Sequence, residues 1–365
     1  MGIKKIRIIP RRWFPNPPES TIISREETMS HVSKVLGTIV LILYAAMTAT
    51  ASQTPADPIR PAATYSIVAI DPESGQMGVA VQSHWFSVGS IVIWAEAGIG
   101  AVATQSFVEP SYGPLGLQLL KAGKTAPQAL AALLLTDGHP DVRQVAMVDS
   151  LGNVAAHTGE KCIPAAGHRQ GKHFSCQANM MEKGTVWDAM ANAFASTPGE
   201  LVDRLLQALQ AAEKEGGDIR GRQSAAIMVV NGNASGTPWR NRVYDLRVED
   251  HRQPLQELQR LVTIAKAYNH MNKGDDLLTE KRIPEALEEY TQAMNIYPEN
   301  PEMIFWPAVT MAATGKVDES LPLFKKVFSR GKNWAELLKR LPGVGQFPDD
   351  PELLKKILFQ LPKTK

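Results

Sequence analysis

Three histidines and two cysteines lie close together in the middle of the sequence and could bind a metal ion. These residues are His157, Cys162, His168, His173 and Cys176. Imidazole and thiolate suit tetrahedral zinc, but the two-residue gap of a zinc ribbon occurs only between His173 and Cys176. The spacing argues against a metal site, so we expect no metal and no cofactor.

The two cysteines have a second possible chemistry. They are the only cysteines of the chain, and in an exported protein we expect Cys162 and Cys176 to form one disulfide that closes a loop of about fifteen residues. Two free, half-buried thiols are the alternative. A thiol nucleophile with His157 as its base is a third reading, which no feature of the spacing favours.

Composition and missing motifs exclude several classes of protein. The chain has 39 basic and 37 acidic side chains and a formal charge of +2, which supplies no basic surface for nucleic acid. It contains no Gly-rich phosphate loop after a strand, no Gly-x-Ser-x-Gly elbow and no metal-binding pair of histidines on one helix face. Nucleotide chemistry and the common serine-hydrolase route are therefore not supported.

The elements that must position any site begin with short β-rich runs. These runs are Tyr65–Ile70, Met77–Val81, Ile91–Trp94, Ile99–Ala103, Ser224–Val230 and Arg242–Val248. Between them we expect two helices, one over Thr185–Ala195 and one that starts at a capping box, Thr197–Glu200, and ends at Gly216. This order of strands, then two helices, then strands again predicts an α+β domain over residues 64–250, with sheets and helices in separate layers.

Residues 251–365 show no strand pattern and contain a repeat. Gly274, Ala286, Tyr290, Ala293 and Pro298 have the spacing of a 34-residue tetratricopeptide repeat. Ala308, Gly315, Ser320 and Phe324 continue the pattern, and a helix over residues 350–359 could form a polar cap. An arbitrary helical extension is the alternative to this tetratricopeptide-like domain.

Residues 1–51 have the pattern of a leader. Lys34 precedes an apolar run of thirteen residues, Val35–Met47, and the small residues Ala49-Thr50-Ala51 follow it. The run is too short to cross a bilayer but has the length of a signal-peptide core. We expect a true start at Met29, a Pro-rich spacer over residues 52–63, a periplasmic or secreted protein, and membrane contact only through the signal peptide. An uncleaved anchor is the alternative.

Several short sequence motifs in the β-rich part occur together in one bacterial family. They are Thr64-Tyr-Ser-Ile-Val-Ala-Ile-Asp71, Gly78-Val-Ala-Val-Gln-Ser83, Gly100-Ala-Val-Ala-Thr-Gln105, Pro110-Ser-Tyr-Gly-Pro114, Ala156-His-Thr-Gly159, Gly221-Arg-Gln-Ser-Ala225 and Asp245-Leu-Arg-Val-Glu-Asp-His251. Over about residues 64–265 the chain resembles the family catalogued as domain of unknown function 1028. The resemblance implies a four-layer αββα sandwich of the N-terminal nucleophile hydrolase type.

The resemblance also suggests a nucleophile. Relatives often begin Met-Thr, and Thr64 is the matching residue here. A Thr at a free N-terminus can act as nucleophile and base together, because its α-amine has a reference pKa of about 7.7–8.0 and can take the hydroxyl proton. This chemistry requires cleavage between Ala63 and Thr64. If residues 52–63 stay attached, Thr64 is an ordinary strand residue.

Such a site needs further polar groups. We expect Asn179 to donate to the oxyanion and Arg222 to hold a substrate carboxylate or depress the amine pKa. A turn residue and a surface ion-pair residue are the plainer readings of these two. Gln82, Ser83 and Gln105 end predicted strands and are expected to line the substrate pocket.

Two functions follow from these expectations. One is an exported hydrolase, with Thr64 cleaving an amide bond in a small acyl-amide or peptide. The other is an inactive exported binding protein that holds a peptide or protein partner on its helical repeats. The mature N-terminus distinguishes them, because a protein that begins at Thr64 supports the enzyme and one that begins at Ser52 supports the binding protein.

Overall fold

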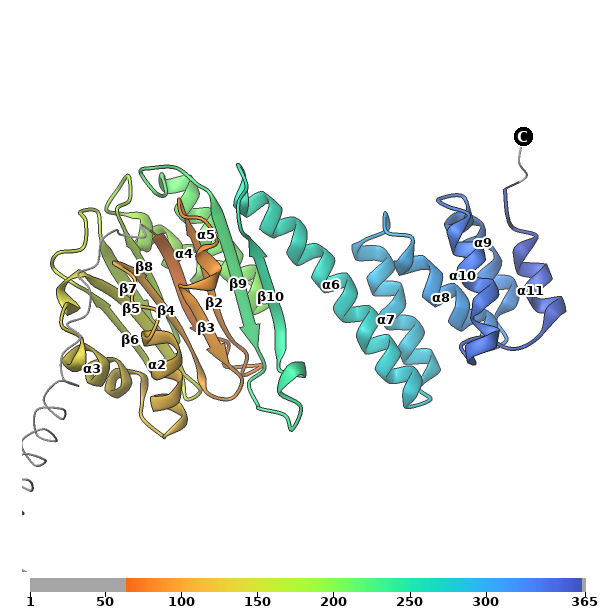
Figure 1. Ribbon diagram of the computed structural model, residues 1–365, viewed down its shortest axis with the longest axis horizontal. Coiled ribbons are helices and arrows are strands. Elements are labelled where there is room, and N and C mark those ends of the chain that lie inside the picture. The colour runs from red at the N-terminus through yellow and green to blue at the C-terminus, as the bar shows by residue number, and fades with distance from the viewer. Residues whose placement is uncertain (1–63, 363–365) are drawn as a thin grey trace, which may run out of the picture. The chain divides into compact units, whose positions relative to one another are not determined.

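The computed structural model describes residues 64–362, so the predicted signal peptide and spacer lie outside the described residues. Ten strands within this range form two antiparallel sheets (Figure 1). The six-stranded sheet has the order β10 (Arg242–Val248), β9 (Ser224–Val230), β2 (Met77–Ser83), β1 (Thr64–Ile70), β8 (Phe174–Asn179), β7 (Gly167–Gly171). The four-stranded sheet has the order β3 (Ile93–Glu96), β4 (Gly100–Ser106), β5 (Arg143–Asp149), β6 (Val154–Thr158).

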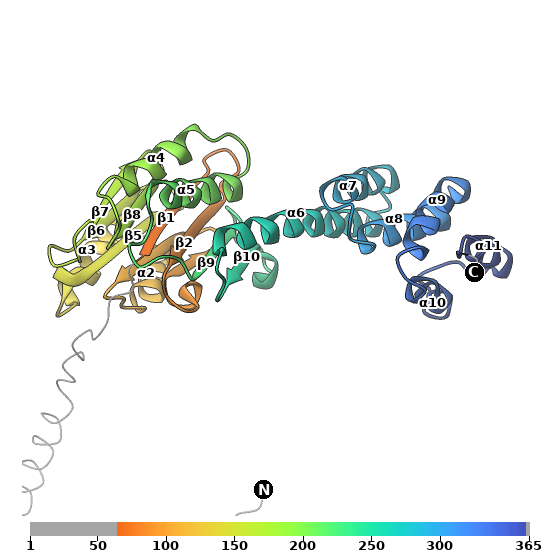
Figure 2. The same cartoon turned by 90° about the horizontal axis from the view of Figure 1, so that it is seen from above.

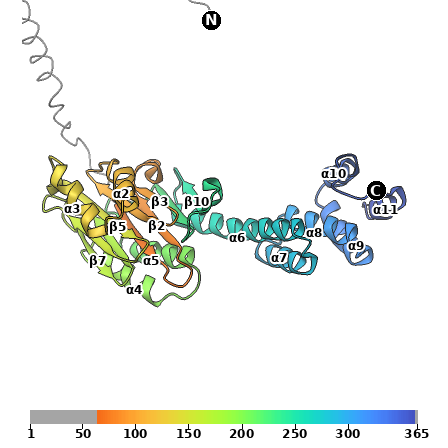
Figure 3. The same ribbon diagram turned by 90° about the horizontal axis from the view of Figure 1, so that it is seen from below.

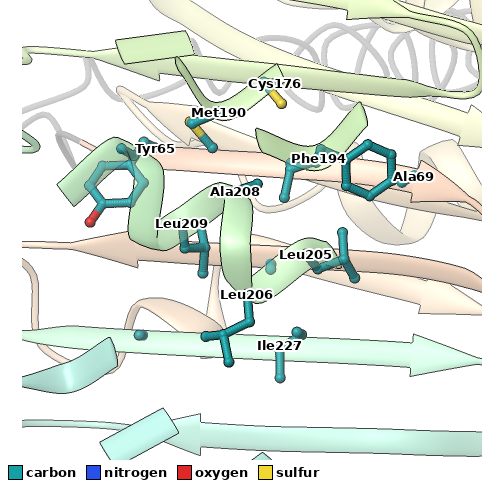
Figure 4. Packing of buried hydrophobic residues seen from close by; sticks show 14 of the residues in the cluster. Tyr65, Ala69, Cys176, Met190, Phe194, Leu205, Leu206, Ala208, Leu209 and Ile227 are labelled. Carbon is teal, nitrogen blue, oxygen red and sulfur yellow. The ribbon is translucent and has the colours of Figure 1, made fainter. Parts of the chain in front are cut away.

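Alternating side chains of β1 show how the layers are arranged. Tyr65, Ile67 and Ala69 are buried with apolar residues of α4 (Val186–Ser196) and α5 (Leu201–Glu215). Figure 4 shows Leu205, Leu206 and Leu209 of α5 over this face. Because successive side chains of a strand point to opposite faces, Val68 and Ile70 face the other way, and they are buried with residues of the four-stranded sheet.

The outer face of the four-stranded sheet is covered by α2 (Tyr112–Lys121) and α3 (Ala126–Thr136). Val145 and Met147 of β5 pack there against Leu117 and Leu120 of α2. Figure 2 shows α4 and α5 on one side of the strands and α2 on the other. The two sheets thus pack against each other, and helices cover their outer faces, which agrees with the predicted α+β class.

Between β10 and residue 362 the structure contains helices and no strand, as the sequence predicts. They are α6 (Pro254–Thr279), α7 (Ile283–Ile296), α8 (Glu302–Ala313), α9 (Val317–Phe328), α10 (Asn333–Arg340) and α11 (Pro351–Leu358). The first half of α6 packs on the six-stranded sheet through Leu255, Leu258 and Val262. Its second half packs against α7 in another cluster (Figure 3). No helix within residues 64–362 is long and apolar enough to span a bilayer.

Gly274 permits the close contact between α6 and α7. A Cβ atom at this position would lie 2.4 Å from Cε1 of Tyr290, far below a normal contact distance. The Tyr290 hydroxyl donates to Asp275 Oδ1 at 2.5 Å, which holds the ring against α6. Gly274 and Tyr290, a small and an aromatic residue at predicted repeat positions, therefore pack against each other.

The predicted capping box at Thr197 is wrong. Thr197 ends α4, and its hydroxyl donates to the Ala193 carbonyl at 2.7 Å. Gly199 has φ +99°, a conformation outside the helical region, and α5 begins only at Leu201, with Glu200 as its N-cap. The segment is thus the connection between two helices.

Candidate functional site

Four polar residues form one row across the six-stranded sheet. The strand register aligns Ser224 of β9, Ser83 of β2, Thr64 of β1 and Asn179 of β8. All four are fully buried. The alternation of β1 places their side chains on the face toward the four-stranded sheet. The Thr64 hydroxyl donates to Ser83 Oγ at 3.2 Å.

Two glutamines of the four-stranded sheet meet this row. Gln105 Nε2 donates to the Thr64 carbonyl at 3.2 Å and to Gln144 Oε1 at 2.7 Å. Asn179 Nδ2 donates to Gln144 Oε1 at 2.9 Å and also approaches the Thr64 carbonyl, at 3.4 Å. Side-chain amides from both sheets therefore hold the first residue of β1.

The polar contacts continue along the space between the sheets. Ser66 donates to Gln105 Oε1, and Gln177 Nε2 donates to Ser66 Oγ, both at 2.6 Å. Space between packed sheets is normally apolar, and further along β1 it is lined by Val68 and Ile70. One end of the interior is thus polar and the other apolar. We take the polar end as the candidate site.

This polar layer contains an acceptor without a partner. Asn179 Oδ1 is buried and makes no hydrogen bond within the described residues. Leaving such a group unpaired costs about 1–3 kcal/mol. A donor that bound at this point would recover that free energy, so the layer has room for one more hydrogen bond at Asn179.

Two of the predicted site residues lie on the other face of the sheet. Gln82 is the register partner of Tyr65, and its Nε2 donates to Glu213 Oε2 of α5 at 3.0 Å. Arg222 pairs with Glu213 Oε1 at 3.2 Å and donates to Gln253 Oε1 at 2.8 Å. The structure therefore brings Thr64, Ser83, Gln105 and Asn179 together but not Gln82 or Arg222.

Glu213 organises this second group of polar residues. Its Oε2 also accepts from the Tyr65 hydroxyl at 2.8 Å. Burial and the adjacent Glu213 carboxylate raise the pKa of Tyr65 above its usual value, so the phenol remains a donor. Gln82, Glu213 and Arg222 line a cavity of about 230 Å³ beside α5.

The predicted disulfide is wrong, because Cys162 and Cys176 are both free and buried. Cys176 lies on the face of β8 that packs on α4 and α5 (Figure 4). The Cys162 thiol donates to the Arg143 carbonyl of β5 at 3.4 Å, toward the four-stranded sheet. The two thiols thus belong to opposite sides of β8. Burial raises the pKa of both.

The histidine rings near these cysteines each form a hydrogen bond with a different part of the chain. His157 Nε2 lies 2.7 Å from the Pro140 carbonyl, His168 Nδ1 lies 2.9 Å from Thr158 Oγ1, and His173 Nδ1 lies 3.2 Å from the Gly152 carbonyl. No three His, Cys, Asp or Glu side chains between residues 64 and 362 are grouped so that they could hold a metal ion.

Sequence reasoning missed three members of the polar layer, namely Ser66, Gln144 and Gln177. The sequence contains a signal for two of them, Ser66 and Gln177. Polar residues occupy every second position at the start of β1, Thr64-Tyr-Ser66, and along β8, Ser175-Cys-Gln-Ala-Asn179. In strands whose other positions are apolar, this alternation marks one polar face.

The chain belongs to a known family. Residues 64–258, more than half of the chain, match the model of the family described as "Family of unknown function (DUF1028)". A similar solved structure is the crystal structure of protein SPO2555 from Silicibacter pomeroyi, whose description names the same family. It is 30% identical, has a TM-score of 0.50, and the match covers 56% of this chain and 89% of that one. No curated protein matches the chain.

Proposed function

We propose that this protein hydrolyses an amide bond with the Thr64 hydroxyl as nucleophile, after cleavage of the peptide bond that precedes Thr64. The observation that carries the proposal is the burial of Thr64 in a layer of polar side chains between the two sheets, where its hydroxyl contacts Ser83. The arrangement of helices and sheets supports a sandwich of the N-terminal nucleophile hydrolase type.

Buried hydroxyl and amide groups beside Thr64 suit its released amine to act as a base. The Thr64 hydroxyl donates to the Ser83 hydroxyl, and the side-chain amides of Gln105 and Asn179 donate to the Thr64 carbonyl. Burial disfavours the charged form of an amine and so lowers its pKa. A free α-amine at Thr64 would therefore be largely neutral at pH 7 and able to accept the hydroxyl proton.

Asn179 is suited to hold that amine. Its amide hydrogens are directed to Gln144 Oε1 and the Thr64 carbonyl, whereas its Oδ1 has no partner within residues 64–362. Because Asn179 is the register partner of Thr64, we assign Oδ1 the role of accepting from the released amine. This differs from the oxyanion role expected from the sequence.

The proposed reaction has two steps. The Thr64 oxygen attacks the amide carbon of an acyl-amide or short peptide, its proton passes to the α-amine, and the C–N bond breaks as the leaving amine takes that proton. Water then hydrolyses the acyl ester and releases a carboxylate and the free hydroxyl. No metal or cofactor takes part in this proposal.

The test uses protein prepared to begin at Thr64 and a panel of acyl-amides and short peptides. Thr64→Ala should abolish turnover with little change in thermal stability, because the attacking oxygen is lost, and Thr64→Ser should keep part of the rate. Intact mass of the exported protein should give Thr64 as the first residue. Equal turnover by wild type and Thr64→Ala would show that the mechanism is wrong.

A second candidate function is binding of a peptide by the helical region. The observation that favours it is a cavity of about 210 Å³ lined by Asp275, Tyr290, Trp306, Thr310 and Gln346. The helix pairs and the contact of Gly274 with Tyr290 support tetratricopeptide-like repeats, whose surfaces often bind peptides. A protein that turns over no substrate and whose helical region captures a peptide would favour this function.

A further inference from the structure

Three segments meet in a cavity that the proposed function does not use. It has a volume of about 600 Å³ and is lined by His84, Arg222, Gln223, Asp250, His251 and Arg252. These residues follow β2, precede β9 and follow β10. Ligand pockets usually have volumes of about 300–1,000 Å³, so the cavity is large enough for a small molecule.

Backbone hydrogen bonds fix the three segments relative to one another. Gln223 N donates to the Ser83 carbonyl at 3.1 Å, and His251 N donates to the Gln223 carbonyl at 2.8 Å. His84 N donates to the buried carboxylate of Asp218 at 3.0 Å. His84, Gln223 and His251 are therefore carried by backbone that hydrogen bonds hold in place.

The cavity offers more donors than acceptors. His251 Nδ1 accepts from Gln253 N at 3.0 Å, so a neutral His251 carries its proton on Nε2 and donates from there. Arg222 uses part of its guanidinium for Glu213 and Gln253, and five N–H groups leave others available. Within residues 64–362, no ion pair links Arg252 to a carboxylate.

The charges of the lining favour a ligand with one negative charge. Arg222 and Arg252 contribute positive charges to the lining and Asp250 a negative charge. Because Glu213 pairs with Arg222, Arg252 is the cation of this lining that is most available to a ligand anion. Guanidinium groups bind carboxylates with paired, charge-assisted hydrogen bonds. A phosphate dianion would meet stronger repulsion from Asp250 than a carboxylate would.

We propose that this cavity binds the carboxylate group of a small molecule, with Arg222, Arg252 and His251 as donors. Arg222 thus belongs to a binding site formed by the ends of β2, β9 and β10, and not to the layer between the sheets. The site requires no cleavage at Thr64 and no chemistry there, so it can be tested separately.

The experiment compares two probes that differ only in charge, N-acetylglycine and N-acetylglycinamide, by calorimetric titration of the whole protein at low ionic strength. Wild type should bind the carboxylate and not the amide. Arg252→Gln should weaken N-acetylglycine binding about tenfold, as expected for loss of a charge-assisted contact. Arg222→Gln should act in the same direction.

The matched control is Arg282→Gln, which removes the same charge from an exposed position at the start of α7 and should leave the affinity unchanged. Equal affinity of Arg252→Gln and Arg282→Gln would overturn the proposal. Equal binding of the two probes, no binding of N-acetylglycine at millimolar concentration, or tighter binding of inorganic phosphate would each overturn it as well.

Discussion

Gln144 holds the two sheets together at their polar end. Its Oε1 accepts from Gln105 and Asn179, and its Nε2 is directed to Thr158 Oγ1 and to the carbonyls of Gly167 and Ala178. The residue thus links β5 to strands of the opposite sheet. Its loss would leave several buried polar atoms without partners.

We therefore expect Gln144→Met to lower the free energy of unfolding by about 2–4 kcal/mol. Each buried polar group that is left without a hydrogen-bond partner costs about 1–3 kcal/mol. Urea denaturation followed by circular dichroism measures the change. The control is Gln170→Met, the same substitution at an exposed position of β7, which should change stability by less than about 0.5 kcal/mol. A similar effect of both variants would contradict the role of Gln144.

Cys176 should make stability depend on alkaline pH. Burial raises its pKa, whereas a thiol in the unfolded chain titrates near 8.5. Above that pH the unfolded chain loses the proton and the folded protein keeps it, so stability falls by up to about 1.4 kcal/mol per pH unit. Below pH 8.5 the contribution of Cys176 is fully present.

The measurement is the free energy of unfolding between about pH 8.5 and 10. This range begins at the pKa of the thiol in the unfolded chain. Cys176→Ala should show a shallower decline than wild type. Met190→Ala removes volume from the same cluster without removing a titrating group, so it should keep the wild-type slope. Identical slopes for wild type and Cys176→Ala would mean that the thiol titrates normally.

At the scale of single residues, the sequence predicted Thr64 and three of the polar residues around it, and it misassigned Gln82 and Arg222. Gln82 and Ser83 were both expected in one pocket, but adjacent residues of a strand must face opposite ways. Arg222 lies in a loop, whose course depends on contacts with Glu213 and Gln253 that are distant in sequence. The partnership of Gln144 with Asn179 likewise arises only from the packing of the two sheets.

Among the elements, α6 takes part in two hydrophobic clusters. We expect a chain of residues 52–266 to fold and one of residues 52–253 to be strongly destabilised, since the shorter chain lacks Leu255, Leu258 and Val262. Burying three such side chains contributes about 4–9 kcal/mol. Thermal unfolding compares the two chains, and equal melting temperatures would show that α6 is dispensable for the sheet domain.

Strands β1, β2, β9 and β10 were predicted close to their observed bounds, because they are continuous or alternating apolar runs. Strands β5 to β8 were missed. The sequence of β7, Gly-His-Arg-Gln-Gly, has no β-branched or aromatic residue. It is a strand because it pairs with β8, a contact that local sequence does not reveal.

For the whole molecule, we propose export. The apolar run Val35–Met47 and the small residues after it motivate the expectation that a shortened protein accumulates outside the cytoplasm. Cell fractionation and intact mass measure this, and Leu41→Arg, which places a charge in the apolar run, should leave full-length protein in the cytoplasm. A full-length wild-type protein in the cytoplasmic fraction would contradict the proposal.

The family match ends at residue 258, but the contacts of α6 with the sheet continue to Val262 and the helix itself continues to Thr279. The end of the family match therefore falls inside the continuous helix α6 and not in a linker. A different C-terminal region could replace this one in a relative only if its first helix kept an apolar stripe equivalent to Leu255, Leu258 and Val262. Recombination at this junction is thus constrained by packing, even though the two regions have separate clusters.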